Sequence, residues 1–217
     1  MLLKSASRIK ILLYDYLVKN YQPNEPIFIS DVLLPVSEGN LRQMFKNLCD
    51  NEKIKRFDTG IYYLPKESRL KGGVPLNADT VARAKYIARK GSIEGYYAGY
   101  TFANQLGLTT QVPYVTEIVS NNASARVREI SLNGKRILLR KSRLPVTKEN
   151  FRVLQFLDLM KDIDTYTDCP AEEASERLIQ YIRSESISGD DVHQYIRRFP
   201  DKIYKNMYEM RLFHVFA

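Results

Sequence analysis

Apolar positions in the first third of the chain recur at helical spacing and then alternate as in strands. Between Ile9 and Leu17 they follow the i, i+3, i+4, i+7 pattern, which predicts a first amphipathic helix. A short apolar segment over residues 27–34 contains Ser30-Asp31, where we expect a helix cap. A second cap at Ser37 predicts a helix over Glu38 to Asn51.

The chain after this helix has the pattern of a β-hairpin. Residues 53–57 and 61–64 flank the turn Asp58-Thr59-Gly60. Two helices followed by such a hairpin are typical of a winged helix-turn-helix, a fold that places one helix in the major groove of DNA.

The helix over residues 38–51 has one apolar face and one polar face. Leu41, Met44, Phe45 and Leu48 share the apolar face, as expected for packing on a small core. Asparagine, glutamine and arginine make paired hydrogen bonds with adenine or guanine edges. We therefore predict that bases are read by Asn40, Gln43, Lys46 and Asn47.

The remaining DNA-contact candidates are cations. Arg42 is expected either to read a base or to hold a phosphate. In the hairpin, Lys53, Lys55 and Arg56 are expected to contact phosphates, which adds affinity and salt dependence rather than sequence choice. The alternative is that the fold serves protein contacts only, because residues 1–66 carry a net charge of only +3.

A polar segment with a Gly-Gly pair and flanking prolines, residues 65–75, predicts a junction between a domain at 1–66 and a domain at 67–217. The second domain is expected to begin with a sheet region at 75–145. Its expected elements are a helix from Asn77 or Asp79 to about Lys90, a strand over 93–98, a helix over 100–106 ended by Gly107, a strand over 114–119, and a hairpin of 126–132 and 135–141 around Asn133-Gly134.

Residues 147–217 have helical periodicity throughout. Separate helices are expected around 151–159, 174–182, 190–199 and 201–216, with Pro200 between the last two. The predicted fold class is α+β: an N-terminal winged helix-turn-helix, then a mixed α/β domain with a helical C-terminal part.

Positive charge is concentrated in the middle of the chain. The net charge of +8 divides into +3 for residues 1–66, +8 for 67–145 and −3 for 146–217. Such a density suggests a polyanionic partner, although a solvated hairpin would have the same composition. The basic side chains of this segment are Arg126, Arg128, Lys135, Arg136, Arg140, Lys141 and Arg143.

Several functional classes are disfavoured by the sequence. No apolar run approaches the roughly 18 residues of a membrane span, and no signal-peptide pattern is visible, so we expect a cytoplasmic protein. The two cysteines, Cys49 and Cys169, lie outside any metal-binding spacing. His193 and His214 have no candidate nucleophile near them in the sequence, so we expect no metal, no cofactor and no catalysis.

One segment, from Gly95 to Pro113, resembles the AbiEi-type antitoxins and their relatives. It combines an aromatic residue, two glycines and an Ala-Asn pair at fixed spacing. The residues that carry the resemblance are Tyr97, Gly99, Ala103, Asn104, Leu106, Gly107, Leu108, Gln111 and Pro113. The same run is also readable as a helix, a glycine stop and a turn, so its role could be conformational.

The resemblance implies a bacterial antitoxin of a type IV toxin–antitoxin system that represses its own operon by binding promoter repeats. Its functional partner would be a nucleotidyltransferase-like toxin, countered without a stable complex. A homodimer and a monomer binding two repeats cooperatively fit paired DNA sites equally. The competing hypothesis is a protein-interaction module that uses the basic hairpin and the acidic helical tail, without sequence-specific DNA binding.

Overall fold

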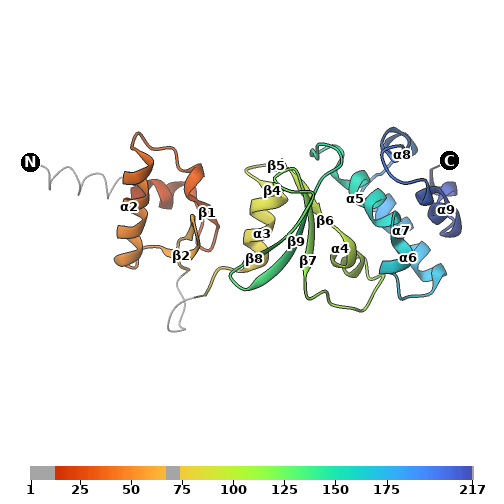
Figure 1. Ribbon diagram of the computed structural model, residues 1–217, viewed down its shortest axis with the longest axis horizontal. Helices are drawn as coiled ribbons and strands as arrows, with labels where there is room; N and C mark the ends of the chain where they lie inside the picture. The colour runs from red at the N-terminus through yellow and green to blue at the C-terminus, as the bar shows by residue number, and fades with distance from the viewer. Residues whose placement is uncertain (1–12, 67–73, 217) are drawn as a thin grey trace, which may run out of the picture. The chain divides into compact units, whose positions relative to one another are not determined.

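The computed structural model describes residues 13–66 and 74–216, and it divides the chain into two units, Met1–Val81 and Ala82–Ala217. Helices and strands are mixed along the chain, consistent with the α+β class (Figure 1). The start of the predicted first helix, residues 9–12, and most of the predicted junction, residues 67–73, lie outside the described residues.

The first unit combines helices with a small antiparallel sheet. Strand β3 pairs with β1 on one side and with β2 on the other. Phe45 and Tyr62 pack in its core with their ring centroids 4.5 Å apart. The elements are a helix over residues 13–20, β1 (Ile27–Phe28), the 3-10 helix η1 (Ile29–Asp31), α2 (Glu38–Asp50), β2 (Lys55–Asp58) and β3 (Ile61–Tyr63).

Helix α2 begins where the sequence predicts it. The Ser37 hydroxyl accepts a hydrogen bond from the backbone N–H of Asn40 at 3.4 Å, which satisfies one of the free donors in the first turn. The helix cap expected at Ser30-Asp31 is wrong, because only the short η1 turn forms there. Val32 directly after it has an extended backbone (φ −85, ψ 106), and Pro35 disfavours a helical backbone at Leu34 as well.

The second unit contains a mixed four-stranded sheet in the order β6-β7-β9-β8. Strands β7 and β9 are parallel, and β8 pairs antiparallel with β9 at the edge of the sheet. Helix α4 packs on β7, and α5 packs on β6. The elements up to this edge are α3 (Ala78–Tyr86), which spans the boundary of the two units, β4 (Ala88–Arg89), β5 (Ser92–Ile93), β6 (Gly95–Tyr97), α4 (Gly99–Gln105), β7 (Thr116–Ser120), β8 (Val127–Leu132) and β9 (Lys135–Lys141).

Backbone angles explain one confirmed turn and one wrong helix end. Asn133 (φ 47) and Gly134 (φ 85) form the tight turn of the predicted β8–β9 hairpin. The helix expected to reach Lys90 ends at Tyr86. Lys90 (φ 49) and Gly91 (φ 83) instead turn the chain between β4 and β5, and the strand expected over 93–98 is split into β5 and β6.

The C-terminal third is helical, as predicted. Helices α8 and α9 pack against α5. The helix expected over 201–216 is too long, because Arg211 takes a positive φ of 53 that an α-helix does not allow. The elements are α5 (Phe151–Met160), α6 (Ile163–Tyr166), α7 (Ala171–Ser184), α8 (Gly189–Ile196), α9 (Lys202–Glu209) and the 3-10 helix η2 (Phe213–Val215).

Candidate nucleic-acid interface

Helix α2 buries one face and exposes the opposite one. Its buried residues are the four predicted from the sequence, Leu41, Met44, Phe45 and Leu48. Most candidate base-reading side chains, including Gln43 and Lys46, are exposed, and Asn47 is half-buried. The unit therefore presents amide and cationic groups on a helix held rigidly by its apolar side.

Three of the candidate DNA-contact side chains make contacts along the helix itself. Arg42 forms an ion pair with Glu38 at 3.1 Å, and the Gln43 amide donates a hydrogen bond to the Asn47 side-chain oxygen at 3.3 Å. Each contact joins side chains one helical turn apart, and the ion pair is largely exposed to solvent. Such contacts contribute little to stability, so these groups can exchange them for contacts with a ligand.

A hollow of about 810 Å³ lies between α2 and the β2–β3 turn. Arg42 and Lys46 of α2 border it on one side, and Arg56 and Thr59 of the hairpin border it on the other. The helix and the hairpin thus bring cations to one concave part of the first unit, as expected of elements that contact the same ligand.

The hairpin cations differ in how freely they can move. Lys53 lies over the Tyr14 ring at 4.7 Å. Arg56 donates to the Asp58 carbonyl at 3.2 Å and to the Thr59 hydroxyl at 3.3 Å, so it also braces the turn. Lys55 is half-buried. Of the three predicted phosphate contacts, Lys53 is the one that lies on the surface without bracing the turn.

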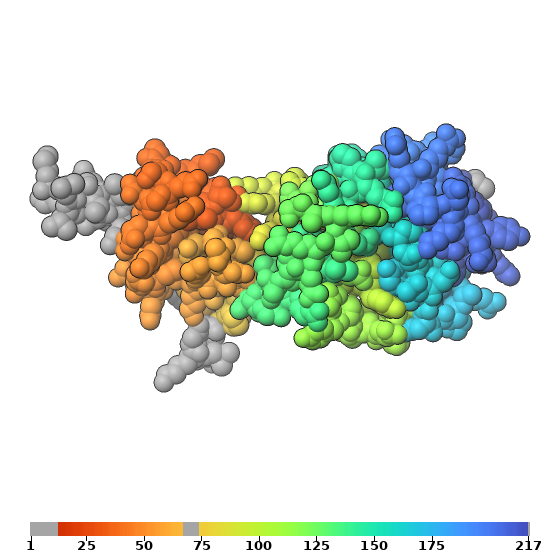
Figure 2. Space-filling model, viewed as in Figure 1, coloured from red at the N-terminus to blue at the C-terminus, as the bar shows by residue number. Residues whose placement is uncertain are grey.

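In the second unit, the β8–β9 hairpin lies on the surface, where it is the green segment of the viewed face (Figure 2). Its seven predicted cations are not equivalent. Arg136 pairs with Glu129 at 2.5 Å, and Arg128 donates to the Ser124 hydroxyl at 3.4 Å. Lys135 is half-buried, whereas Arg126, Lys141 and Arg143 are exposed.

Arg140 departs from the prediction of an exposed basic surface. Only 20% of its side chain is accessible, and its guanidinium pairs with the Asp158 carboxylate of α5 at 2.8 Å. Lys161 binds the same carboxylate at 3.2 Å. Burial of Arg140 follows from the packing of α5 on the sheet, which brings Asp158 to it from 18 residues away along the chain.

The segment that carries the family resemblance orders a loop. The Asn104 amide donates hydrogen bonds to the carbonyls of Thr109 and Gln111, at 3.3 and 3.1 Å. The Thr109 hydroxyl donates to Asp168 at 2.6 Å, and Gly107 has a φ of 72. These contacts favour the conformational reading of the segment.

Sequence reasoning missed three charged residues that organise the second unit: Asp158, Lys161 and Asp168. Asp158 and Lys161 are i,i+3 neighbours at the end of a largely apolar helix, which was the available signal for a buried charge. No comparable local signal marks Asp168, because its partners lie 58 and 59 residues away.

A family of unknown function, DUF6088, matches residues 15–165. The chain belongs to this family. The matched region includes α2, the β8–β9 hairpin and Asp158, whereas α7, α8 and α9 follow it. No curated protein matches the chain. In the described ranges 13–66 and 74–216, no helix has the length and apolar character needed to cross a membrane.

Proposed function

We propose that the first unit is a winged helix-turn-helix that binds double-stranded DNA, with α2 lying in the major groove and the β2–β3 hairpin against the backbone. The observation that carries the proposal is the exposed face of α2, where Asn40, Gln43 and Lys46 lie opposite the buried Leu41, Phe45 and Leu48. A major groove about 12 Å wide admits one α-helix.

The amide and the cationic side chains have different roles in this proposal. The amides of Asn40, Gln43 and Asn47 can each donate and accept, as the pairing with adenine requires. Lys53 and Arg56 supply positive charge for phosphates, which carry no sequence information. Arg42 borders the hollow between helix and hairpin, where its guanidinium could contact either a base or a phosphate.

The biological role we propose is that of an AbiEi-type antitoxin that represses its own operon by binding promoter repeats. This part rests on the resemblance of the segment 95–113 to AbiEi-type antitoxins. It also rests on the domain order, in which the proposed DNA-binding unit precedes a second unit. The functional partner would be a nucleotidyltransferase-like toxin, and the second unit would carry the antitoxin activity.

A gel shift with the full chain tests DNA binding. The probes are the DNA upstream of its own gene and a scrambled duplex of equal length, each at low and at moderate salt. Gln43→Ala should weaken binding to the upstream DNA by about 5- to 150-fold, since a lost bidentate base contact costs about 1–3 kcal/mol. It should also bring the affinities for the two duplexes closer together.

Gln22→Ala is the matched control, because Gln22 is an exposed glutamine of the same unit outside α2. It should leave both affinities unchanged. Equal binding of upstream and scrambled DNA by the unaltered chain would contradict sequence-specific regulation. A pull-down that retains a protein at high salt, from a chain with no DNA affinity, would favour the protein-interaction module instead.

The antitoxin role has its own test. Expression of the neighbouring reading frame, where it encodes a nucleotidyltransferase-like protein, should arrest growth, and co-expression of this chain should restore it. Gln43→Ala should retain the rescue if toxin neutralisation belongs to the second unit. Failure of the unaltered chain to rescue would reject the antitoxin role and leave the DNA-binding proposal standing.

A further inference from the structure

A pocket of about 450 Å³ lies in the second unit where the end of β9, the residues before β8 and helix α5 meet. The charged groups that line it are five cations and one carboxylate, so the lining has a net charge of +4. The charged residues are Arg126, Arg140, Lys141, Arg143, Asp158 and Lys161. A concave site of this volume is in the range of small-ligand pockets.

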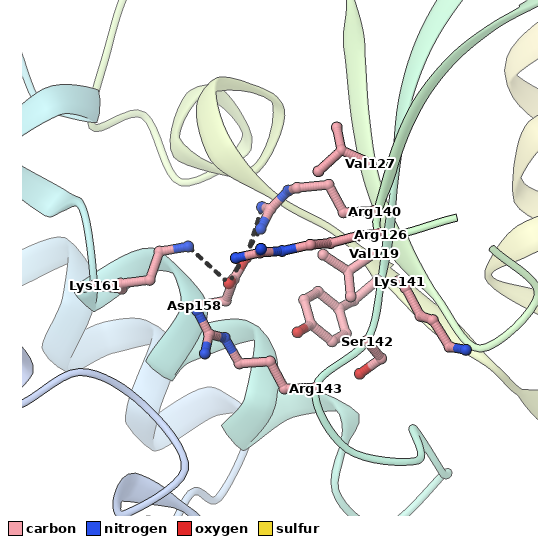
Figure 3. A pocket seen from close by; sticks show the side chains of 10 residues that line it. Val119, Arg126, Val127, Arg140, Lys141, Ser142, Arg143, Asp158 and Lys161 are labelled. Carbon is pink, nitrogen blue, oxygen red and sulfur yellow. Dashed lines mark hydrogen bonds and ion pairs between the residues drawn. The ribbon is translucent and has the colours of Figure 1, made fainter. Parts of the chain in front are cut away.

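Four cationic side chains turn toward the Asp158 carboxylate, whereas Lys141 turns away from it (Figure 3). The four are Arg126, Arg140, Arg143 and Lys161. They come from the residues before β8, from β9, from the residues after β9 and from the residue after α5. Cations from four separate segments converge on one point only because the fold brings them there.

The carboxylates at the pocket are already paired. Asp162, which follows Lys161, binds Lys161 at 3.2 Å and also pairs with Lys202. Asp158 is already paired with Arg140 at 2.8 Å and with Lys161 at 3.2 Å. Within residues 13–66 and 74–216, neither Arg126 nor Arg143 has an acidic group at salt-bridge distance. The Arg143 guanidinium lies over the Phe199 ring, 5.8 Å from its centroid. Two guanidinium groups therefore remain uncompensated at the mouth of a partly buried ion pair.

A buried hydrogen-bond donor without an acceptor also favours an anionic ligand at this pocket. The Nε of Arg140 is buried and has no hydrogen-bond partner among the described residues. An unsatisfied buried donor costs about 1–3 kcal/mol, so natural proteins seldom keep one unless another molecule supplies the acceptor. Arg140 also lines the pocket, so this unsatisfied donor belongs to one of the arginines of the site.

We propose that this pocket binds a phosphorylated ligand of nucleotide size, held by the guanidinium groups of Arg126, Arg140 and Arg143. Guanidinium pairs bidentately with phosphate oxygens, and the volume leaves room for more than the phosphate alone. The phosphate belongs either to a free nucleotide or to the 5′ end of a nucleic-acid strand. This inference goes beyond DNA binding by α2 and does not depend on it.

Isothermal titration calorimetry on the full chain at low salt tests the proposal with three phosphate probes and their matched controls. Inorganic pyrophosphate is compared with sulfate, ADP with adenosine, and a short single-stranded DNA carrying a 5′-phosphate with the same strand carrying a 5′-hydroxyl. At least one phosphate probe should bind 10-fold more tightly than its control. Preference for ADP identifies a free nucleotide, and preference for the 5′-phosphorylated strand identifies a strand end. No preference in any pair would overturn the proposal.

Variants separate a built site from diffuse attraction. Arg126→Gln and Arg143→Gln should each weaken the preferred probe by about 10-fold, as expected for the loss of one charge-assisted pair. Arg128→Gln removes the same charge from the same hairpin outside the pocket and should weaken it less than 2-fold. Equal weakening by all three would overturn the proposal in favour of nonspecific electrostatics.

The three substituted arginines, Arg126, Arg128 and Arg143, are exposed. The melting temperatures of the variants should therefore be unchanged, and a loss of binding cannot be attributed to unfolding. Gln43→Ala should leave phosphate binding intact. A failed DNA-binding proposal and a failed phosphate-pocket proposal therefore give different results.

Discussion

Helix α2 and the phosphate pocket at the end of β9 carry the same kinds of cation in different settings. On α2, Arg42 and Lys46 are exposed at the border of the hollow between helix and hairpin, and the Arg42–Glu38 ion pair is open to solvent. In the pocket, Arg140 is largely buried against Asp158, and further arginines gather around that pair. Exposed cations along a helix suit an extended polyanion, whereas a cluster around a largely buried ion pair suits a compact one.

The largest expected contrast concerns the acidic partners of the two regions. Asp158→Ala leaves the Arg140 charge without its carboxylate in a poorly solvated place, while Lys161 keeps its ion pair with Asp162, so we expect a loss of about 3 kcal/mol in the free energy of unfolding. Glu38→Ala breaks the exposed pair on α2 and should cost less than about 1 kcal/mol. Urea unfolding followed by circular dichroism measures both. Similar losses would break the distinction between a buried and an exposed cation site.

Two glycines sharpen the same comparison. Gly99 opens α4 with a φ of 53, and a Cβ there would collide with the Glu117 carboxylate. Gly99→Ala should therefore destabilise the second unit by about 1–3 kcal/mol. Gly39 lies in α2 with open space around it, so Gly39→Ala should raise stability by up to about 1 kcal/mol. Calorimetric melting of both variants checks this, and a stabilised Gly99→Ala chain would contradict it.

Salt dependence separates the two cation sites by function. Lys53→Gln removes one phosphate contact. The slope of log affinity against log salt concentration, measured with a blunt duplex that has 5′-hydroxyl ends, should therefore become less steep by about 0.9. Arg143→Gln, in the pocket of the second unit, should leave that slope unchanged. The reverse pattern would assign duplex binding to the second unit.

The smallest expected effect is the pH dependence of two glutamates in the second unit. Burial raises the pKa of Glu117, against hydrogen bonding from the Tyr100 N–H and attraction by Arg140. The folded state then binds the proton more tightly than the unfolded state, so stability falls as pH rises from the usual glutamate pKa through the raised one. Glu117→Gln should remove this decline and raise the melting temperature at neutral pH.

Glu129 is the control with the opposite sign. The hydrogen bond from Arg136 lowers the pKa of Glu129, so its contribution is present above the usual glutamate pKa and is lost as pH falls through the lowered value. Glu129→Gln should lower the melting temperature slightly at neutral pH. Melting curves from pH 3 to pH 8 measure both variants, and a shift of the same sign in both would contradict the burial of Glu117.

Short-range signals carried most of the successful predictions. The Ser37 cap, the buried face of α2 and the Asn133-Gly134 turn each depend on residues within a few positions of one another. The wrong predictions arose where a helical pattern continued along the sequence but the backbone turned before the pattern ended. Helical periodicity continued past Tyr86, for example, but a turn at Lys90 and Gly91 redirected the chain into a two-stranded hairpin.

By itself the sequence determined that the chain has an amphipathic helix with an amide and cationic face, and a basic hairpin in its middle, because both are matters of residue type and spacing. Only the tertiary structure decided which cations of the hairpin are free. Helix α5 returns to the sheet and places Asp158 beside Arg140, and the residues flanking the hairpin bring Arg126 and Arg143 to the same point. A run of like charges has no preferred arrangement until long-range packing supplies the carboxylate and the cavity around it.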